Sequence, residues 1–194
     1  MTSRPAVFLD RDGTLTEEVG YVNHPSRLRL LPRAAEAIRR LNAAGVAAVV
    51  VTNQAGIARG YFSESVLHAV NDALRAQLAD AGARLDGLYA CMHHPTEGEA
   101  PYRAQCECRK PKPGLLLRAA AELGLDLTRS TMVGDKASDL VPARAVGADA
   151  VLVLTGYGRG EWEYQRERFE VVPDHVAGDL LDAVEWALAK QVAA

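Results

Sequence analysis

Short apolar runs alternate along the chain with longer stretches in which apolar residues recur every three or four positions. The apolar runs are continuous, which is typical of parallel strands that are buried on both faces. Buried strands are predicted at residues 6–10, 46–52, 85–94, 130–135 and 148–156. Helices are predicted at residues 32–45, 63–82, 112–125, 138–147 and 178–190, with Pro32 in the first turn of the first helix and Pro142 near the start of the fourth.

Strands that alternate with helices in this way predict an α/β fold, a doubly wound parallel sheet with helices on both faces. The sequence contains no internal repeat, low-complexity tract or evident linker, so residues 1–194 are expected to form one domain. No long insertion follows the first strand or lies between residues 54 and 110. A separate cap domain is therefore not expected.

Composition restricts the class of protein further. Of 194 residues, 48% are apolar and 24% are charged, and the net charge is −3. These values are ordinary for a soluble globular protein and argue against one that coats nucleic acid. No apolar run approaches the roughly 18–20 residues of a membrane span, and the first residues, "MTSRPAVFLDRDG", lack the apolar core of a signal peptide. We therefore expect a cytoplasmic protein that binds neither membranes nor nucleic acids. Nothing resembles an assembly face, so a monomer is expected.

Polar residues follow the predicted strands at the points where the strands end. In an open α/β sheet, the carboxyl ends of the strands meet along one edge, and functional residues gather there. Two carboxylates placed two residues apart repel each other unless a cation compensates, and Mg²⁺ prefers carboxylate and phosphate oxygens. These ends therefore predict a site for Mg²⁺ and a phosphoryl group. The residues concerned are Asp10 and Asp12, then Thr52, Asn53 and Gln54, then Arg109 and Lys110, and finally Asp135, Lys136 and Asp139.

All three cysteines of the chain lie in one short window together with two histidines. Cys91, His93, Cys106 and Cys108 provide the Cys₃His ligand set of a closed, structural zinc site, although His94 could replace His93. An odd number of cysteines without an export signal argues against a disulfide framework. We expect Zn²⁺ to hold the loop of about residues 91–108 and to fix the adjacent Arg109 and Lys110 over the site.

Four segments together resemble the motifs of the haloacid dehalogenase superfamily of phosphatases: "DRDGT", "VVVTNQ", "KPKPG" and "VGDKASD". The resemblance implies that Asp10 is the nucleophile that forms an aspartyl-phosphate and that Asp12 acts as general acid and base. It also implies that Thr52 and Lys110 bind the phosphoryl oxygens. Mg²⁺ would be held by the carboxylates of Asp10 and Asp135 and by the backbone carbonyl of Asp12.

The zinc loop and the segment "TNQAGIARGYF" narrow the resemblance to the D-glycero-D-manno-heptose 1,7-bisphosphate 7-phosphatases, which serve nucleotide-activated heptose and surface polysaccharide synthesis. The small substrate would then be a phosphorylated sugar. The resemblance implies that Asn53, Gln54 and Arg109 contact the substrate and that Lys136 adds positive charge. Ala55 stands where many members have serine, which puts one minor substrate contact in doubt.

Two alternatives stay open from the sequence. The histidinol-phosphate phosphatases are close relatives that share the zinc loop. A phospho-accepting receiver module of signalling proteins also places Asp, Thr and Lys at parallel strand ends, but its accepting aspartate follows a later strand and it has no use for a zinc loop.

Overall fold

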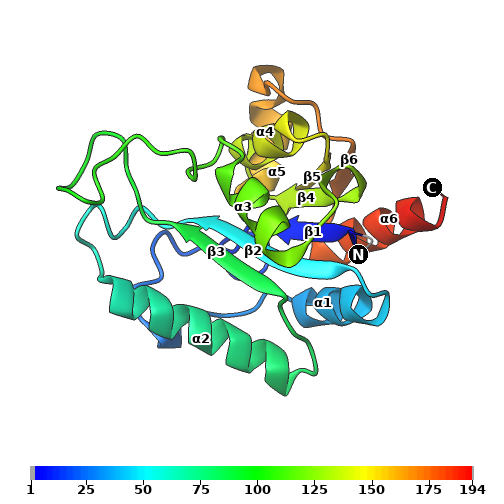
Figure 1. Ribbon diagram of the computed structural model, residues 1–194, viewed down its shortest axis with the longest axis horizontal. Helices are drawn as coiled ribbons and strands as arrows, with labels where there is room; N and C mark the ends of the chain where they lie inside the picture. Colours follow the sequence, from blue (N-terminus) through cyan, green and yellow to red (C-terminus); the bar gives the residue numbers. More distant parts are fainter. Residues whose placement is uncertain (1–2, 194) are drawn as a thin grey trace.

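The computed structural model describes residues 3–193 and contains a six-stranded parallel sheet with the strand order β3-β2-β1-β4-β5-β6. From the central β1, the chain first builds the sheet outward through β2 and β3 and then returns to build the other half. The strands are β1 (Ala6–Leu9), β2 (Ala47–Asn53), β3 (Gly87–Cys91), β4 (Thr131–Gly134), β5 (Asp149–Val153) and β6 (His175–Ala177). The predicted doubly wound parallel sheet is therefore confirmed (Figure 1).

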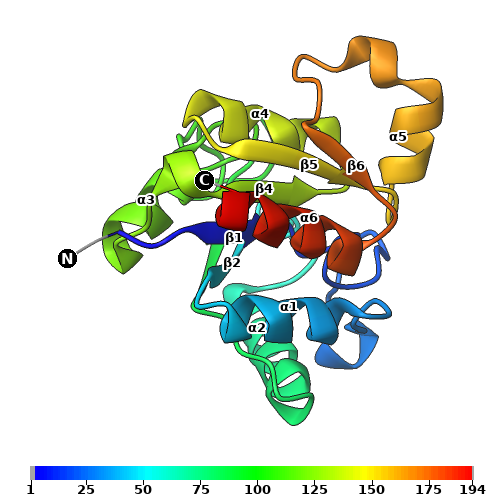
Figure 2. The same ribbon diagram turned by 90° about the vertical axis from the view of Figure 1, so that its right-hand side faces the viewer.

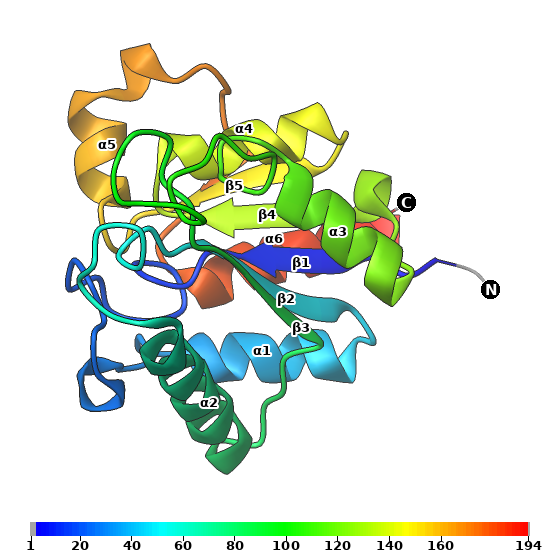
Figure 3. The same cartoon turned by 60° about the vertical axis from the view of Figure 1, so that its left-hand side comes forward.

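Helices cover both faces of the sheet. They are α1 (Ala34–Ala43), α2 (Glu64–Asp80), α3 (Gly114–Leu123), α4 (Ala137–Ala145), α5 (Gly158–Tyr164) and α6 (Leu180–Ala193), with short 3₁₀ turns at Pro25–Arg27, Leu127–Arg129 and Arg166–Arg168. One core lies under α1, α2 and α6 and the other lies under α3 and α4. Figure 2 shows α6 in front of the strands, and Figure 3 shows α3 on the opposite face.

The alternation of side chains along β1 explains why two cores form. Val7 and Leu9 point into the first core, whereas Ala6 and Phe8 point into the second, and all four are buried. Each buried leucine-sized side chain contributes about 1.5–3 kcal/mol relative to an exposed one. A strand with apolar residues at every position therefore stabilises both layers, as the continuous apolar run predicted.

The boundaries of several predicted elements need correction. Helix α1 begins at Ala34, not at Pro32, because Arg33 adopts a left-handed conformation with φ 62° and so interrupts the helix before its first turn. Pro142 lies inside α4 and not near its start. That helix begins earlier than predicted because the Asp139 carboxylate accepts the Lys136 N–H and caps its first turn.

Two further differences concern the strands. The strand predicted at residues 85–94 ends at Cys91, where the chain leaves the sheet, and the three-residue β6 was not predicted. A strand of three residues has too little periodicity to be recognised without its partner β5.

Residues 1, 2 and 194 of the predicted single domain lie outside the described residues. No helix in the described part of the chain is both long and apolar enough to cross a bilayer.

Candidate active site

The carboxyl ends of β1 and β4 and the first turn of α4 bring three aspartates together at the edge of the sheet. Oxygens of Asp10, Asp135 and Asp139 lie within 4.8 Å of one another, and all three residues are buried. Lys110 provides the compensating charge, because its Nζ lies 2.6 Å from Asp10 Oδ1 and 2.8 Å from Asp139 Oδ1. The sequence placed Asp139 near this edge, but it gave no sign that Asp139 would share Lys110 with Asp10.

Burial and repulsion between neighbouring carboxylates raise the pKa values of two of these aspartates, Asp10 and Asp135. Burial, opposed by Lys110 and reinforced by Asp139, raises the pKa of Asp10 from 3.8 to about 6. Burial, followed by the charges of Asp139 and Asp10, raises the pKa of Asp135 from 3.8 to about 8. The two aspartates, which are buried and near one another, raise the pKa of Lys110 despite its burial, so it stays a cation. One lysine therefore does not neutralise the three carboxylates.

The buried carboxylate of Asp135 has an oxygen without a partner. Its Oδ2 accepts the Tyr157 N–H at 2.9 Å, whereas its Oδ1 has no hydrogen-bond partner. A buried polar atom of this kind needs an explanation such as an ion. Carboxylate oxygens crowded around an unpartnered oxygen fit a hard divalent cation. The residues present are thus suited to Mg²⁺.

Two glycines make room for the Asp135 carboxylate. A Cβ on Gly13 would lie 2.1 Å from Asp135 Oδ2, and a Cβ on Gly156 would lie 2.2 Å from the same atom. Both glycines adopt positive φ angles, 89° for Gly13 and 54° for Gly156. The glycine of the "DRDGT" motif is therefore required by close contact as well as by the turn.

Asp12 lines a cavity at this edge of the sheet, and Gln54, the residue directly after β2, reaches it. The Gln54 amide donates to Asp12 Oδ2 at 2.8 Å and to Thr52 Oγ1 at 3.0 Å. Thr16 Oγ1 donates to Asp12 Oδ1 at 3.3 Å. The Asp12 side chain is 15% exposed. Asp12 is thus held by several donors but still open to a bound molecule.

Asn53 makes a contact that sequence reasoning did not anticipate. Its Nδ2 donates to the Lys110 carbonyl at 3.0 Å, and its Oδ1 accepts the Lys110 N–H at 3.1 Å. The Asn53 side-chain amide thereby pairs with both the carbonyl and the N–H of the Lys110 backbone. Asn53 lines the cavity, as expected of a substrate contact, but its amide also fixes the position of Lys110.

Asp10, Asp12, Asn53 and Lys110 line a cavity of about 520 Å³. The segment after β1 and the segment before α3 also contribute to its lining. Arg109 donates from Nη1 to the His93 carbonyl at 3.2 Å. Lys136 Nζ lies 3.4 Å from Glu18 Oε2 and 4.3 Å above the centre of the Tyr157 ring. The side chains of Glu18 and Tyr157 were not among the predicted site residues. The lining residues are Asp10, Asp12, Glu18, Gly20, Tyr21, Thr52, Asn53, Gln54, Ala55, Arg109, Lys110, Pro111, Lys136, Ser138, Asp139 and Tyr157.

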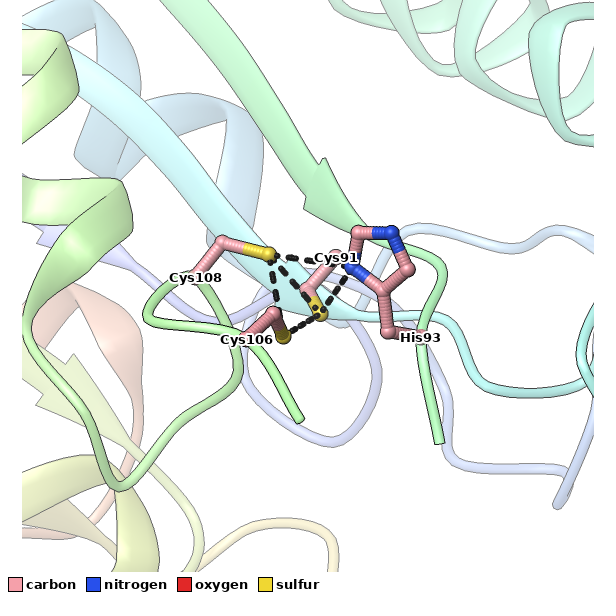
Figure 4. A group of neighbouring side chains, drawn as sticks. All are labelled: Cys91, His93, Cys106 and Cys108. Atoms are coloured by element: carbon pink, nitrogen blue, oxygen red, sulfur yellow. Dashed lines mark hydrogen bonds between the residues drawn. The ribbon is translucent and has the colours of Figure 1, made fainter. Parts of the chain in front are cut away.

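The side chains of the four predicted zinc ligands point toward one another (Figure 4). The Sγ atom of Cys108 lies 3.2 Å from that of Cys91 and 3.3 Å from that of Cys106, and 3.3 Å from His93 Nδ1. Tetrahedral zinc with bonds of about 2.3 Å to sulfur would separate two sulfurs by about 3.8 Å. Three sulfur atoms and one imidazole nitrogen that lie this close together form a possible metal site.

His94 does not join the thiols. Its Nε2 lies 3.1 Å from an Arg59 nitrogen, and its Nδ1 accepts the backbone N–H of Glu97 at 3.0 Å. The group is also tied to the active site through the sheet, because Cys91 at the end of β3 pairs in register with Asn53 at the end of β2. The possible metal site and Asn53, which supports Lys110, therefore lie next to each other.

Comparison with known proteins gives a consistent family. The family model described as HAD-hydrolase-like matches residues 107–183. A D-glycero-D-manno-heptose-1,7-bisphosphate 7-phosphatase of Thermosynechococcus vestitus is 45% identical over 94% of this chain and 95% of its own length. The D-glycero-beta-D-manno-heptose-1,7-bisphosphate 7-phosphatase of Escherichia coli K12 is 44% identical over 79% of this chain and 81% of its own length.

Solved structures agree. The D,D-heptose 1,7-bisphosphate phosphatase of B. bronchiseptica, complexed with magnesium and phosphate, has a TM-score of 0.83 and 33% identity, covering 96% of this chain and 99% of its own. A putative HAD-like phosphatase of Mesorhizobium loti has a TM-score of 0.80 and 36% identity, covering 96% of this chain and 88% of its own. Our chain therefore belongs to the haloacid-dehalogenase-like phosphatases, in the family of the heptose-1,7-bisphosphate 7-phosphatases.

Proposed function

We propose that this phosphatase removes the 7-phosphate from D-glycero-D-manno-heptose 1,7-bisphosphate through an aspartyl-phosphate on Asp10. The observation that carries the mechanism is the pairing of Asp10 with Lys110 at 2.6 Å, beside the unpartnered oxygen of Asp135. The names of the relatives support the choice of substrate. A nucleophile held between the lysine ammonium and a bound metal ion suits phosphoryl transfer, because that reaction depends mainly on positioning and charge stabilisation.

Mg²⁺ would be held by the carboxylates of Asp10 and Asp135 and by the carbonyl of Asp12. When bound, it supplies Lewis-acid stabilisation of the phosphoryl oxygens. The magnesium and phosphate in the B. bronchiseptica relative support this assignment. Zn²⁺ would be held by Cys91, His93, Cys106 and Cys108, as a closed structural site with no position for water.

The chain's own side chains account for both chemical steps. An Asp10 oxygen forms a bond to phosphorus as the bond from phosphorus to the sugar oxygen breaks, and Asp12 gives its proton to that leaving oxygen. In the second step Asp12 takes a proton from water, whose oxygen attacks phosphorus and releases Asp10. Lys110 and Thr52 stabilise the phosphoryl oxygens throughout.

The remaining cations suit a second phosphate. A sugar bisphosphate carries about four negative charges, and charge-assisted hydrogen bonds to phosphate are strong. Arg109 and Lys136 line the cavity next to the acidic cluster, and Gln54 offers polar contacts to the sugar. We further propose that residues 1–194 act as a single domain and a monomer in the cytoplasm, where a thiolate zinc site stays reduced.

A phosphate-release panel tests the substrate. In the presence of Mg²⁺, both anomers of the heptose bisphosphate, histidinol phosphate and a 3′-phosphorylated oligonucleotide are compared by kcat/KM. We expect a heptose anomer to be preferred. A higher kcat/KM for histidinol phosphate would overturn the substrate, and a stable phosphoprotein without turnover would favour the receiver-like alternative.

Two variants test the roles of the aspartates. Asp10→Asn should abolish turnover and the trapping of a phosphoenzyme. Asp12→Asn should still allow trapping when the leaving group is activated, since such a group departs without a proton. Loss of trapping in Asp12→Asn even with an activated leaving group would show that the assigned role is wrong.

A further inference from the structure

Arg11 lies between the two aspartates of the "DRDGT" motif and is the largest fully buried side chain in the described chain. Its Nε and Nη2 donate to the two Asp12 carboxylate oxygens at 3.0 and 2.9 Å, so that the guanidinium and the carboxylate form a two-pronged pair. Its Nη1 donates to Asn71 Oδ1 at 3.0 Å. Arg11 therefore connects the cavity-lining Asp12 to helix α2.

A buried ion pair gives weak support to stability, because desolvation of both charges offsets their attraction. Apolar residues of similar volume could fill such a place at little or no cost. The two parallel hydrogen bonds from the Arg11 guanidinium instead provide a fixed geometry, because they define both the direction and the plane of the Asp12 carboxylate. The burial of Arg11 is thus better explained by orientation of Asp12 than by stability.

We propose that Arg11 and Asn71 are positioning residues that aim the Asp12 carboxylate at the leaving oxygen of the substrate. The inference rests on the proposed acid–base role of Asp12. Arg11 fixes the carboxylate from behind, and Asn71 fixes the guanidinium by accepting from the nitrogen that Asp12 does not use. Neither residue lines the cavity, so both act through Asp12 and not on the substrate.

Asn71 belongs to a helix that otherwise presents apolar residues to the core. The buried residues of α2 are Leu67, Val70, Asn71, Leu74 and Leu78. An amide among them must be satisfied, and Arg11 Nη1 is the partner that the structure provides. Through this chain of hydrogen bonds, the position of α2 against the sheet determines the direction of the Asp12 carboxylate.

The test separates orientation from stability by the nature of the leaving group. Single-turnover rates of Asn71→Ala and Arg11→Lys are measured with a sugar phosphate, whose leaving alcohol needs a proton, and with p-nitrophenyl phosphate, whose leaving group does not. Because general acid catalysis contributes about 10²–10⁴-fold, we expect the sugar phosphate rate to fall about tenfold in Asn71→Ala and about a hundredfold in Arg11→Lys. The p-nitrophenyl phosphate rate should fall less than about threefold, and KM should be unchanged in both variants.

Gln77→Ala is the matched control. Gln77 lies on the same helix and donates to the Leu28 carbonyl at 3.3 Å, away from Asp12. It should lose some stability without any change in the ratio of the two rates. Equal losses on both substrates in Asn71→Ala, or no loss on either, would overturn the proposal even if Arg11→Lys does not fold.

Asp12→Asn in the same assay distinguishes this inference from the proposed function. It should show the strongest dependence on the leaving group. If it shows none, the acid–base role of Asp12 fails. If it shows the dependence and the Asn71 and Arg11 variants do not, only the positioning role fails.

Discussion

The acidic cluster should make the magnesium-free protein less stable as the pH rises. The pKa of Asp135 is raised from 3.8 to about 8 in the folded protein, and that of Asp10 is raised to about 6. Between the unfolded and the folded pKa, the folded state therefore holds protons that the unfolded state has released. The contribution of these two groups to stability is fully present below about pH 4. That contribution is lost as the pH rises through their two folded pKa values.

The size of the effect follows from the shifts. Each unit of pKa difference corresponds to about 1.4 kcal/mol, so Asp135 alone lowers the free energy of unfolding by roughly 4 kcal/mol between pH 5 and 8. Asp10 adds roughly 1 kcal/mol between pH 5 and 6. A loss of this size is a large share of the roughly 5–15 kcal/mol of a typical protein and corresponds to a fall in Tm on the order of 10 °C.

Other carboxyls do not obscure this window. Asp86, Asp126 and Asp174 have lowered pKa values. They are ionised in both the folded and the unfolded state above about pH 5, so their contribution changes only at lower pH. A slope between pH 5 and 8 therefore reports on groups such as Asp10 and Asp135.

Urea unfolding at pH 5, 6.5 and 8, with and without Mg²⁺, measures the effect. Magnesium is omitted without a chelator, so that the Zn²⁺ proposed for the thiol site is not removed. Mg²⁺ should stabilise little at pH 5 and most at pH 8, and Asp135→Asn should flatten the magnesium-free slope because an amide does not titrate. A magnesium-free free energy that stays level or rises from pH 5 to 8, or an unchanged slope in Asp135→Asn, would refute the reasoning.

Three further predictions concern single features of the site. Stripping the thiol-bound metal and then restoring Mg²⁺ should raise KM and lower Tm, because Cys108 holds the segment before Lys110; an unchanged KM would contradict this support. Lys110→Met should cost about 3–5 kcal/mol in urea unfolding and nearly all activity, since it leaves Asp10 and Asp139 without their shared cation. Gly156→Ala should cost about 1–3 kcal/mol and raise the Mg²⁺ concentration needed for activity, because its Cβ would lie 2.2 Å from the Asp135 carboxylate. Gly124→Ala is its control: φ is a similar 64° and a Cβ there would meet nothing within 4 Å, so Mg²⁺ dependence should not change.

Predictions from local sequence succeeded where a residue's own neighbours decide the outcome. The five predicted strands formed because each apolar run buries side chains on both faces of the sheet, as Val7 and Phe8 do in β1. Ser63 caps α2 by accepting the Val66 N–H at 3.4 Å, which requires only a hydroxyl directly before the helix. Pro32 was misplaced because the left-handed conformation of Arg33 depends on the path into α1, which the sequence pattern does not encode.

Predictions about the site divide in the same way. The strand-end motifs identified Asp10, Asp12, Asp135 and Lys110 as one group, and the structure brings them to one edge of the sheet. Tyr157 reaches the cavity from a segment with no recognisable motif, so no local signal could have indicated it. Arg11 is within the motif, but its burial against α2 could not be inferred from a charged residue in a loop.

The sequence by itself determined the parallel sheet, the placement of the motifs at the carboxyl ends of its strands and the kinds of ligand available for two metals. These depend on apolar periodicity and on residue types, which are local properties. Only the tertiary structure decided which partners the charges share. Lys110 pairs with Asp10 across a separation of 100 residues and also with Asp139, and Asn53 supports Lys110 across a separation of 57. Such pairings depend on how buried charges find compensation once solvent is excluded, and that is settled by packing and not by any stretch of sequence alone.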